Sequence, residues 1–120
     1  MKSRKAFAIG AVAMAQGHHP TLAAKNYCPR VKELEKILLD LKVKNVPVFF
    51  PAGNASNKSR IDWPACIPVS MAIGALDTKG EIANYSNYDR NLVDFYVIGT
   101  APSLMPGGSE SSATGTSVST

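Results

Sequence analysis

Two short polar segments of this chain hold residue types that could take part in an acyl transfer. The first is Ala52-Gly53-Asn54, which directly follows the apolar run Val46–Phe50. An amide on a glycine turn beyond a strand end can direct its N–H group at a bound ligand. The second is Gly115-Thr116-Ser117, in which a serine after a tight turn can present a nucleophilic hydroxyl and a backbone N–H donor. Taken singly, each segment is more often an ordinary turn or a solvated loop.

The side chains that could activate a serine are few. His18 and His19 are the two histidines of the chain, and exposed loop histidines are the more ordinary interpretation of such a pair. Asp62 and Asp94 are candidate carboxylates for orienting a base, but neither lies within a motif.

The composition is that of a globular domain or of a part of one. The 120 residues are 45% hydrophobic and 18% charged, and no apolar run approaches the roughly 18 residues of a membrane span. The net charge of +4 is modest, and its Lys and Arg clusters fit a solvated helix face better than a nucleic-acid surface. Neither a nucleic-acid partner nor a membrane is therefore expected. Cys28 and Cys66 lack the spacing of a metal site, so a disulfide and two buried thiols both remain open.

Hydrophobic periodicity predicts the elements that would position these residues. The first fifty residues show the order strand, helix, strand, which is a crossover unit of a parallel sheet. Further strands follow, and a Gly- and Ser-rich segment then carries Ser117. The fold class is therefore α/β with a mostly parallel sheet. The expected bounds are strand 6–15 (covered on both faces), helix 30–41, strand 46–50, strand 69–76, shorter strands 82–85 and 92–98, and a nucleophile loop 106–120.

The order and spacing of several motifs resemble the subtilase family of serine peptidases. The matching segments are Val46–Asn54, Trp63-Pro64-Ala65-Cys66, Ala72-Ile73-Gly74-Ala75, Tyr85-Ser86-Asn87, Pro106-Gly107-Gly108 and Gly115-Thr116-Ser117. Upstream, Met14 and Gly17 fit the family's substrate-lining segment, which would make residues 6–15 a core strand. The rival interpretation is a secretory signal, with a basic start, an apolar stretch and Ala13-Met14-Ala15 as its cleavage site.

The resemblance implies a partial subtilisin-like fold and serine endopeptidase chemistry without a cofactor or a metal. Ser117 would be the nucleophile, and Asn54 would be the oxyanion-hole donor together with the backbone N–H of Ser117. A peptide or protein substrate would add as a strand at an edge of the sheet. The residues implied in substrate binding are Ala15, Gln16, Gly17, Ala52 and Gly53.

The resemblance also implies a cis bond between Trp63 and Pro64 and a disulfide between Cys28 and Cys66. A disulfide needs an oxidising compartment, which agrees with secretion or another extracytoplasmic location.

Parts of the family pattern are absent. The family's catalytic Asp and His precede every segment matched here, and the family continues into a helix after the nucleophile. We therefore expect a piece truncated at both ends, inactive alone, whose partner is the missing N-terminal part of the same catalytic domain. Because Ala15-Gln16 and Val97-Ile98-Gly99 depart from the pattern, a non-catalytic, subtilase-derived peptide-binding or structural protein remains the alternative.

Overall fold

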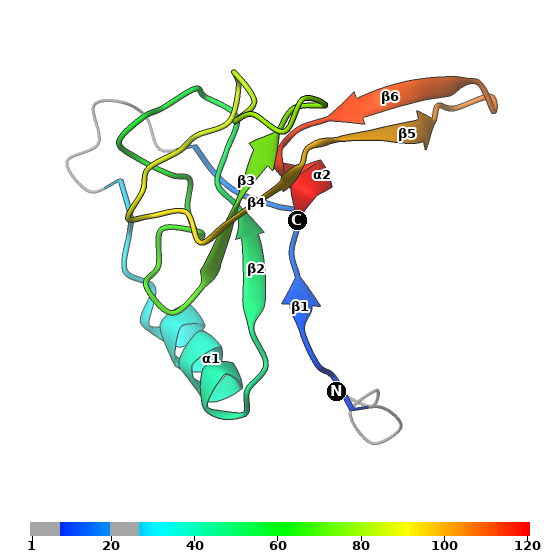
Figure 1. Cartoon of the computed structure of the whole chain (residues 1–120). Helices are drawn as coiled ribbons and strands as arrows, with labels where there is room; N and C mark the ends of the chain where they lie inside the picture. Colours follow the sequence, from blue (N-terminus) through cyan, green and yellow to red (C-terminus); the bar gives the residue numbers. More distant parts are fainter. Residues whose placement is uncertain (1–7, 20–26) are drawn as a thin grey trace.

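The computed structural model describes residues 8–19 and 27–120, and Figure 1 shows a parallel sheet as its centre. Residues 1–7 and 20–26, which include the basic start of the chain, lie outside the described part. The four strands of the sheet stand in the order β1-β2-β3-β4, and all neighbours are parallel. Their bounds are Val12–Ala13 for β1, Val48–Pro51 for β2, Met71–Leu76 for β3 and Phe95–Ile98 for β4.

The two central strands form the core because their side chains are small or apolar on both faces. Val48 and Phe50 of β2 are 4% and 2% exposed, and Ala72 and Ala75 of β3 are fully buried. A strand covered on both faces is expected to be a continuous apolar run, as both of these are. The fold class predicted from the sequence, α/β with a mostly parallel sheet, is confirmed.

Strand β1 differs from its prediction in length and in burial. Only Val12 and Ala13 pair with β2, opposite Val48 and Phe49. Because β1 is the edge strand of the described sheet, Ala13 and Met14 are exposed and not covered on both faces. The first two residues of the predicted strand 6–15 lie outside the described residues.

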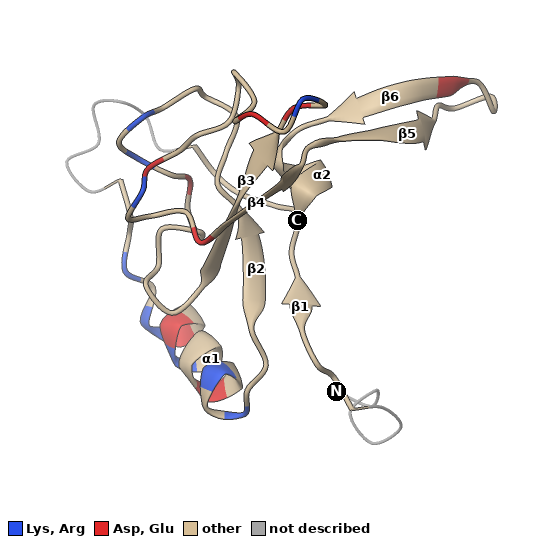
Figure 2. Cartoon of the chain, viewed as in Figure 1, with Lys and Arg blue, Asp and Glu red and all other residues tan. Residues whose placement is uncertain are grey.

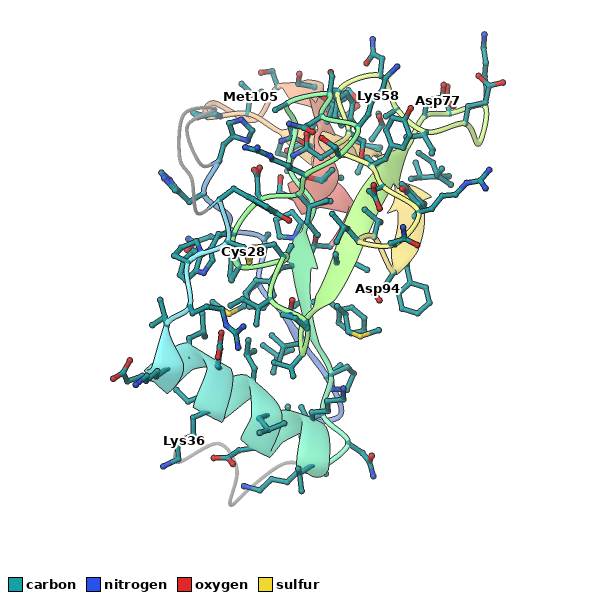
Figure 3. The ribbon with its side chains drawn as sticks, turned by 90° about the vertical axis from the view of Figure 1, so that its left-hand side faces the viewer. Cys28, Lys36, Lys58, Asp77, Asp94 and Met105 are labelled. Carbon is teal, nitrogen blue, oxygen red and sulfur yellow. A yellow bond between two sulfur atoms is a disulfide. The ribbon has the colours of Figure 1, made fainter. Side chains whose placement is uncertain are left out.

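Helix α1, Lys32–Val43, connects β1 to β2 and packs on the sheet through one apolar face. Leu38 is 3% exposed, and Leu34 and Leu41 pack partly buried against the core. The helix ends where Asn45 adopts a positive φ of 55°, a conformation that asparagine tolerates after a helix C-terminus. Its Lys residues are exposed (Figure 2), and the Lys36 side chain extends into solvent (Figure 3).

The C-terminal segment contains a β-hairpin that the sequence did not predict. Strands β5 (Thr100–Leu104) and β6 (Glu110–Thr114) pair antiparallel and extend beyond the sheet (Figure 1). Gly107 and Gly108 have φ of 94° and 83° in the connecting turn, which only glycine adopts freely. After the hairpin, helix α2 (Thr116–Ser119) returns to β2, β3 and β4. The hairpin thus brings residue 117 back to the sheet.

Two covalent features agree with what the family resemblance implies. Cys28 and Cys66 form a disulfide that joins the segment before α1 to the loop before β3. The peptide bond between Trp63 and Pro64 is cis. Across residues 8–19 and 27–120, no helix has the length and apolar character to cross a bilayer.

Candidate active site

Asn54 lies immediately beyond the carboxyl end of β2, on a loop whose shape depends on Gly53. Gly53 has a φ of +105°, and a Cβ there would overlap the Asp62 carboxylate and the Asn87 amide. Any other residue would therefore meet both backbone strain and a steric clash. Asn54 itself is exposed, whereas Ala52 and Gly53 are buried beneath it.

Asn87 holds this loop from below. Its side chain is fully buried, and its carbonyl oxygen accepts hydrogen bonds from the backbone N–H groups of Ala55 (3.0 Å) and Asn57 (2.9 Å). Its Nδ2 donates to the Ala52 carbonyl (2.9 Å) and to Asp62 Oδ1 (3.1 Å). Breaking any of these hydrogen bonds would leave a buried polar group without a partner. The Asn87 amide therefore holds the loop rigidly.

Thr116 sets the orientation of the Asn54 amide. The Thr116 backbone N–H donates to Asn54 Oδ1 at 2.8 Å, and its hydroxyl donates to the same oxygen at 3.0 Å. Since a backbone N–H can only donate, the atom facing Thr116 must be the carbonyl oxygen of the amide. The Thr116 hydroxyl also accepts a bond from Gly53 N at 3.1 Å. Asn54 Nδ2 is therefore turned away from Thr116.

Ser117 and Asn54 lie near each other in the fold, although they are far apart in the sequence. Thr116, the residue before Ser117, is 62 positions after Asn54. A Cβ placed on Gly115 would stand 3.3 Å from Ser117 Oγ and 3.4 Å from Asn54 Nδ2. Ser117 is exposed, and its backbone N–H lies in the first turn of α2, where no intrahelical acceptor exists. The Ser117 hydroxyl and the Asn54 amide thus both lie beside Gly115.

A polar cleft of about 410 Å³ opens at this place, at the edge where the parallel strands end. One wall contains Ala15, Gln16 and Gly17, which follow β1, and the opposite wall contains Gly53 and Asn54. Ala52 does not line it, because this residue is fully buried and its carbonyl accepts bonds from Asp62 N and Asn87 Nδ2. The remaining lining residues are Pro51, Asp62, Thr116 and Ser117.

Of the histidines and carboxylates considered from the sequence, His19 and Asp62 lie together, and Asp94 lies apart from them. His18 and His19 are exposed, as expected, but His19 Nδ1 lies 2.7 Å from Asp62 Oδ1. His18 forms a backbone bridge with Trp63, which joins the wall after β1 to the loop of Asp62. Asp94 precedes β4, at the opposite end of the sheet, and accepts a bond from Ala72 N (Figure 3). Asp94 therefore plays no part in the cleft.

Charge is concentrated away from the cleft. Figure 2 shows Lys and Arg on α1 and the loops, while β1, β2, β3 and α2 carry none. The Arg30–Glu35 ion pair, which raises the pKa of Arg30 and lowers that of Glu35 through their hydrogen bond, sits at the start of α1. Within residues 8–19 and 27–120, no three metal-binding side chains come together.

Polar side chains thus gather beyond the ends of the strands of a parallel sheet. This arrangement defines an α/β protein with a cleft at the carboxyl edge of its sheet. The chain belongs to the Subtilase family, whose profile matches residues 8–120. It therefore has a subtilisin-type peptidase fold.

Solved structures show the same fold at low sequence identity. The prenylagaramide maturation protease PagA superposes with a TM-score of 0.78 at 21% identity, covering 99% of this chain and 42% of that one. The self-cleaved protease domain of PatA gives 0.76 at 23% identity, with 99% and 43% covered. The PatG macrocyclase domain gives 0.70 at 24% identity, with 92% and 32% covered. A search of curated proteins found no significant match. The chain thus spans less than half the length of these structures.

Two residues of the site, Thr116 and Asn87, had no assigned role in the sequence prediction. Thr116 and Asn87 were parts of matching motifs, so the signal was present, but their hydrogen bonds are visible only in the fold. Asp62 was considered only as a carboxylate that could orient a base, and no motif marked it, because its partners His19 and Asn87 are 43 and 25 residues away.

Proposed function

We propose that this chain forms the nucleophile-bearing part of a serine endopeptidase. Ser117 Oγ attacks the carbonyl carbon of a peptide bond, and Asn54 Nδ2 and the Ser117 N–H donate to the oxygen as it becomes negative. The single observation that carries this proposal is the approach of the Asn54 amide to the Ser117 hydroxyl, with the amide oriented by Thr116.

The bonds made and broken are those of acyl transfer. The Oγ–carbon bond forms as a base takes the serine proton, and the peptide C–N bond breaks as the amine takes that proton. Water then hydrolyses the acyl ester and restores the serine. Among the described residues, the cleft lining contains no histidine, and His19 bonds to Asp62. We assign the base to a histidine outside these 120 residues, so that the chain alone is inactive.

The edge strand supports a peptide as the substrate. β1 ends the described sheet, and the exposed segment Ala15-Gln16-Gly17 continues from it into the cleft. An extended peptide can add to such an edge through backbone hydrogen bonds. The disulfide fits an oxidising, extracytoplasmic compartment.

Labelling with a fluorophosphonate tests the nucleophile. The full-length product of the gene, including whatever coding sequence flanks residues 1–120, should react, and Ser117→Ala should abolish both labelling and proteolysis. Ser112→Ala is the matched control, because Ser112 is an exposed serine on β6 and should keep full reactivity. Undiminished labelling of Ser117→Ala would remove this residue from the mechanism. A full-length protein that binds peptides without labelling would instead be the non-catalytic relative.

Kinetics of Asn54→Ala test the oxyanion donor. Loss of one such donor lowers turnover by about 10²–10³-fold, a value taken from subtilisin and not calculated for this chain. We expect kcat to fall far more than KM rises, because the donor acts on charge that develops only in the transition state. A variant that mainly weakens substrate binding would refute the assignment.

A further inference from the structure

Asp62 is the one charged side chain that lines the cleft in the described part of the chain. The other lining residues, from both walls and from α2, are uncharged. In a cleft partly shielded from water, a single carboxylate dominates the local field, because the effective dielectric constant is lower there. A cation that enters the cleft is therefore attracted to Asp62.

The carboxylate of Asp62 is incompletely paired. The residue is 8% exposed, and burial of an ionised carboxylate is costly unless its oxygens have donors. Both of its side-chain hydrogen bonds, from His19 Nδ1 at 2.7 Å and from Asn87 Nδ2 at 3.1 Å, reach the same oxygen, Oδ1. Oδ2 has no donor among the described residues. It is an acceptor that a ligand can use.

The free oxygen packs against Gly53, and both residues line the cleft. A Cβ on Gly53 would overlap Asp62 Oδ2, so this oxygen lies directly against the Gly53 backbone. Gly53 lines the cleft next to Asn54, which in turn approaches Ser117. The lining thus leads from the reactive hydroxyl past Asn54 and Gly53 to the carboxylate.

Resting on the peptidase function proposed above, we propose that Asp62 selects substrates with Lys or Arg as the residue whose carbonyl is attacked. With that carbonyl held between Ser117 and Asn54, the adjacent side chain enters the space between residues 15–17 and Gly53. An ammonium or guanidinium group at its end can donate to Asp62 Oδ2. Such charge-assisted bonds are stronger than neutral ones and are lost with a neutral substrate side chain.

A purely structural carboxylate would behave differently. Asp62 also ties the segment of His19 to the loop held by Asn87, but that tie uses Oδ1 alone. If tying were its whole function, Asp62→Asn and His19→Ala would disturb the cleft alike. If Oδ2 binds a cation, only the change at residue 62 removes the binding charge.

Binding of benzamidine tests the charge without any dependence on catalysis. The measurement uses the full-length gene product carrying Ser117→Ala, titrated by calorimetry with benzamidine and with its neutral analogue benzamide. We expect benzamidine to bind more tightly than benzamide. Asp62→Asn should weaken benzamidine binding by about 10–100-fold, since hydrogen bonds to charged groups are worth about 1.5–3 kcal/mol. His19→Ala should retain the binding, because it leaves the carboxylate in place.

Cleavage of matched peptides tests selection in the reaction. Peptides that differ only in Arg or Gln on the acyl side should be cleaved with a strong preference for Arg by the protein with Ser117 intact. Asp62→Asn should lower the Arg-to-Gln ratio of kcat/KM by about 10–100-fold.

The outcomes separate this inference from the proposed function. No cleavage of any peptide, together with selective benzamidine binding, refutes the peptidase function and leaves the cation site in place. Cleavage without a preference for Arg, or equal binding of benzamidine and benzamide, overturns the role of Asp62. If Asp62→Asn does not fold, the comparison of benzamidine with benzamide on the otherwise unchanged protein decides.

Discussion

Replacement of Thr116 by valine gives a quantitative test of the site, because the change removes a hydroxyl and keeps the shape of the side chain. The hydroxyl donates to Asn54 Oδ1 and accepts from the buried Gly53 N–H. A neutral hydrogen bond contributes about 0.5–1.5 kcal/mol net, and a stranded buried donor costs about 1–3 kcal/mol. Thr116→Val should therefore lower the free energy of unfolding by roughly 2–4 kcal/mol.

The same substitution should slow the reaction to a limited extent. Asn54 Oδ1 keeps its bond from the Thr116 backbone N–H, so the amide is loosened but not released. If the lost bond of about 0.5–1.5 kcal/mol is fully expressed in the transition state, the rate falls by up to about tenfold. This loss is far smaller than the effect expected for removing Asn54 itself.

Thr116→Ser is the matched control, since it keeps the hydroxyl and removes one methyl group, which is worth about 1 kcal/mol. The assay compares unfolding by urea and the second-order rate of fluorophosphonate labelling in the full-length protein. We expect the serine variant to label at nearly the unmodified rate. Valine and serine variants of equal stability and equal labelling rate would refute the role assigned to the Thr116 hydroxyl.

Three further predictions concern stability and are measured by unfolding of the full-length protein. Reduction of the Cys28–Cys66 disulfide, which closes a separation of 38 residues, should cost about 4 kcal/mol by the chain-entropy relation; an unchanged unfolding midpoint in reductant would contradict this. Gly53→Ala should destabilise far more than Gly80→Ala, because both glycines have positive φ but only Gly53 has side chains in the path of a Cβ; equal losses would show that strain alone matters. Burial raises the pKa of Tyr96 above its ordinary value of 10, so its contribution to stability is fully present below about pH 10 and is lost as the pH rises further; Tyr96→Phe should flatten the pH dependence of unfolding in that range.

Sequence patterns predicted the elements whose side chains are uniformly buried or periodic. β2, β3 and α1 are of this kind, and each begins and ends within two residues of its predicted bounds. The α1 bounds differ because Val31 has an extended backbone and Lys44 still bonds to the last turn. Such terminal details depend on local hydrogen bonds that the apolar pattern does not record.

The hairpin of β5 and β6 could not be predicted in the same way. Its residues are mostly small and polar, with Pro102 inside a strand, and none of its strand residues is fully buried. Its order comes from backbone pairing across a glycine turn and not from an apolar face. The composition therefore indicated a loop.

The residues of the site show the same contrast between what local motifs predict and what only the folded contacts reveal. Asn54 and Ser117 could be named because each belongs to a short motif, and the fold places them together. Ala52 belongs to the same motif as Asn54, yet it faces the protein interior, because the chain alternates direction at the strand end. The importance of Asp62 depends on contacts made across 25 and 43 residues, which no local pattern contains.

A crystal structure of the full-length protein with a peptidyl boronate bonded to Ser117 tests the central claim most directly. The account predicts that one boronate oxygen lies about 2.7–3.1 Å from both Asn54 Nδ2 and the backbone nitrogen of Ser117. A tetrahedral adduct whose oxygens contact neither donor, or a boronate that bonds to another residue, would contradict it.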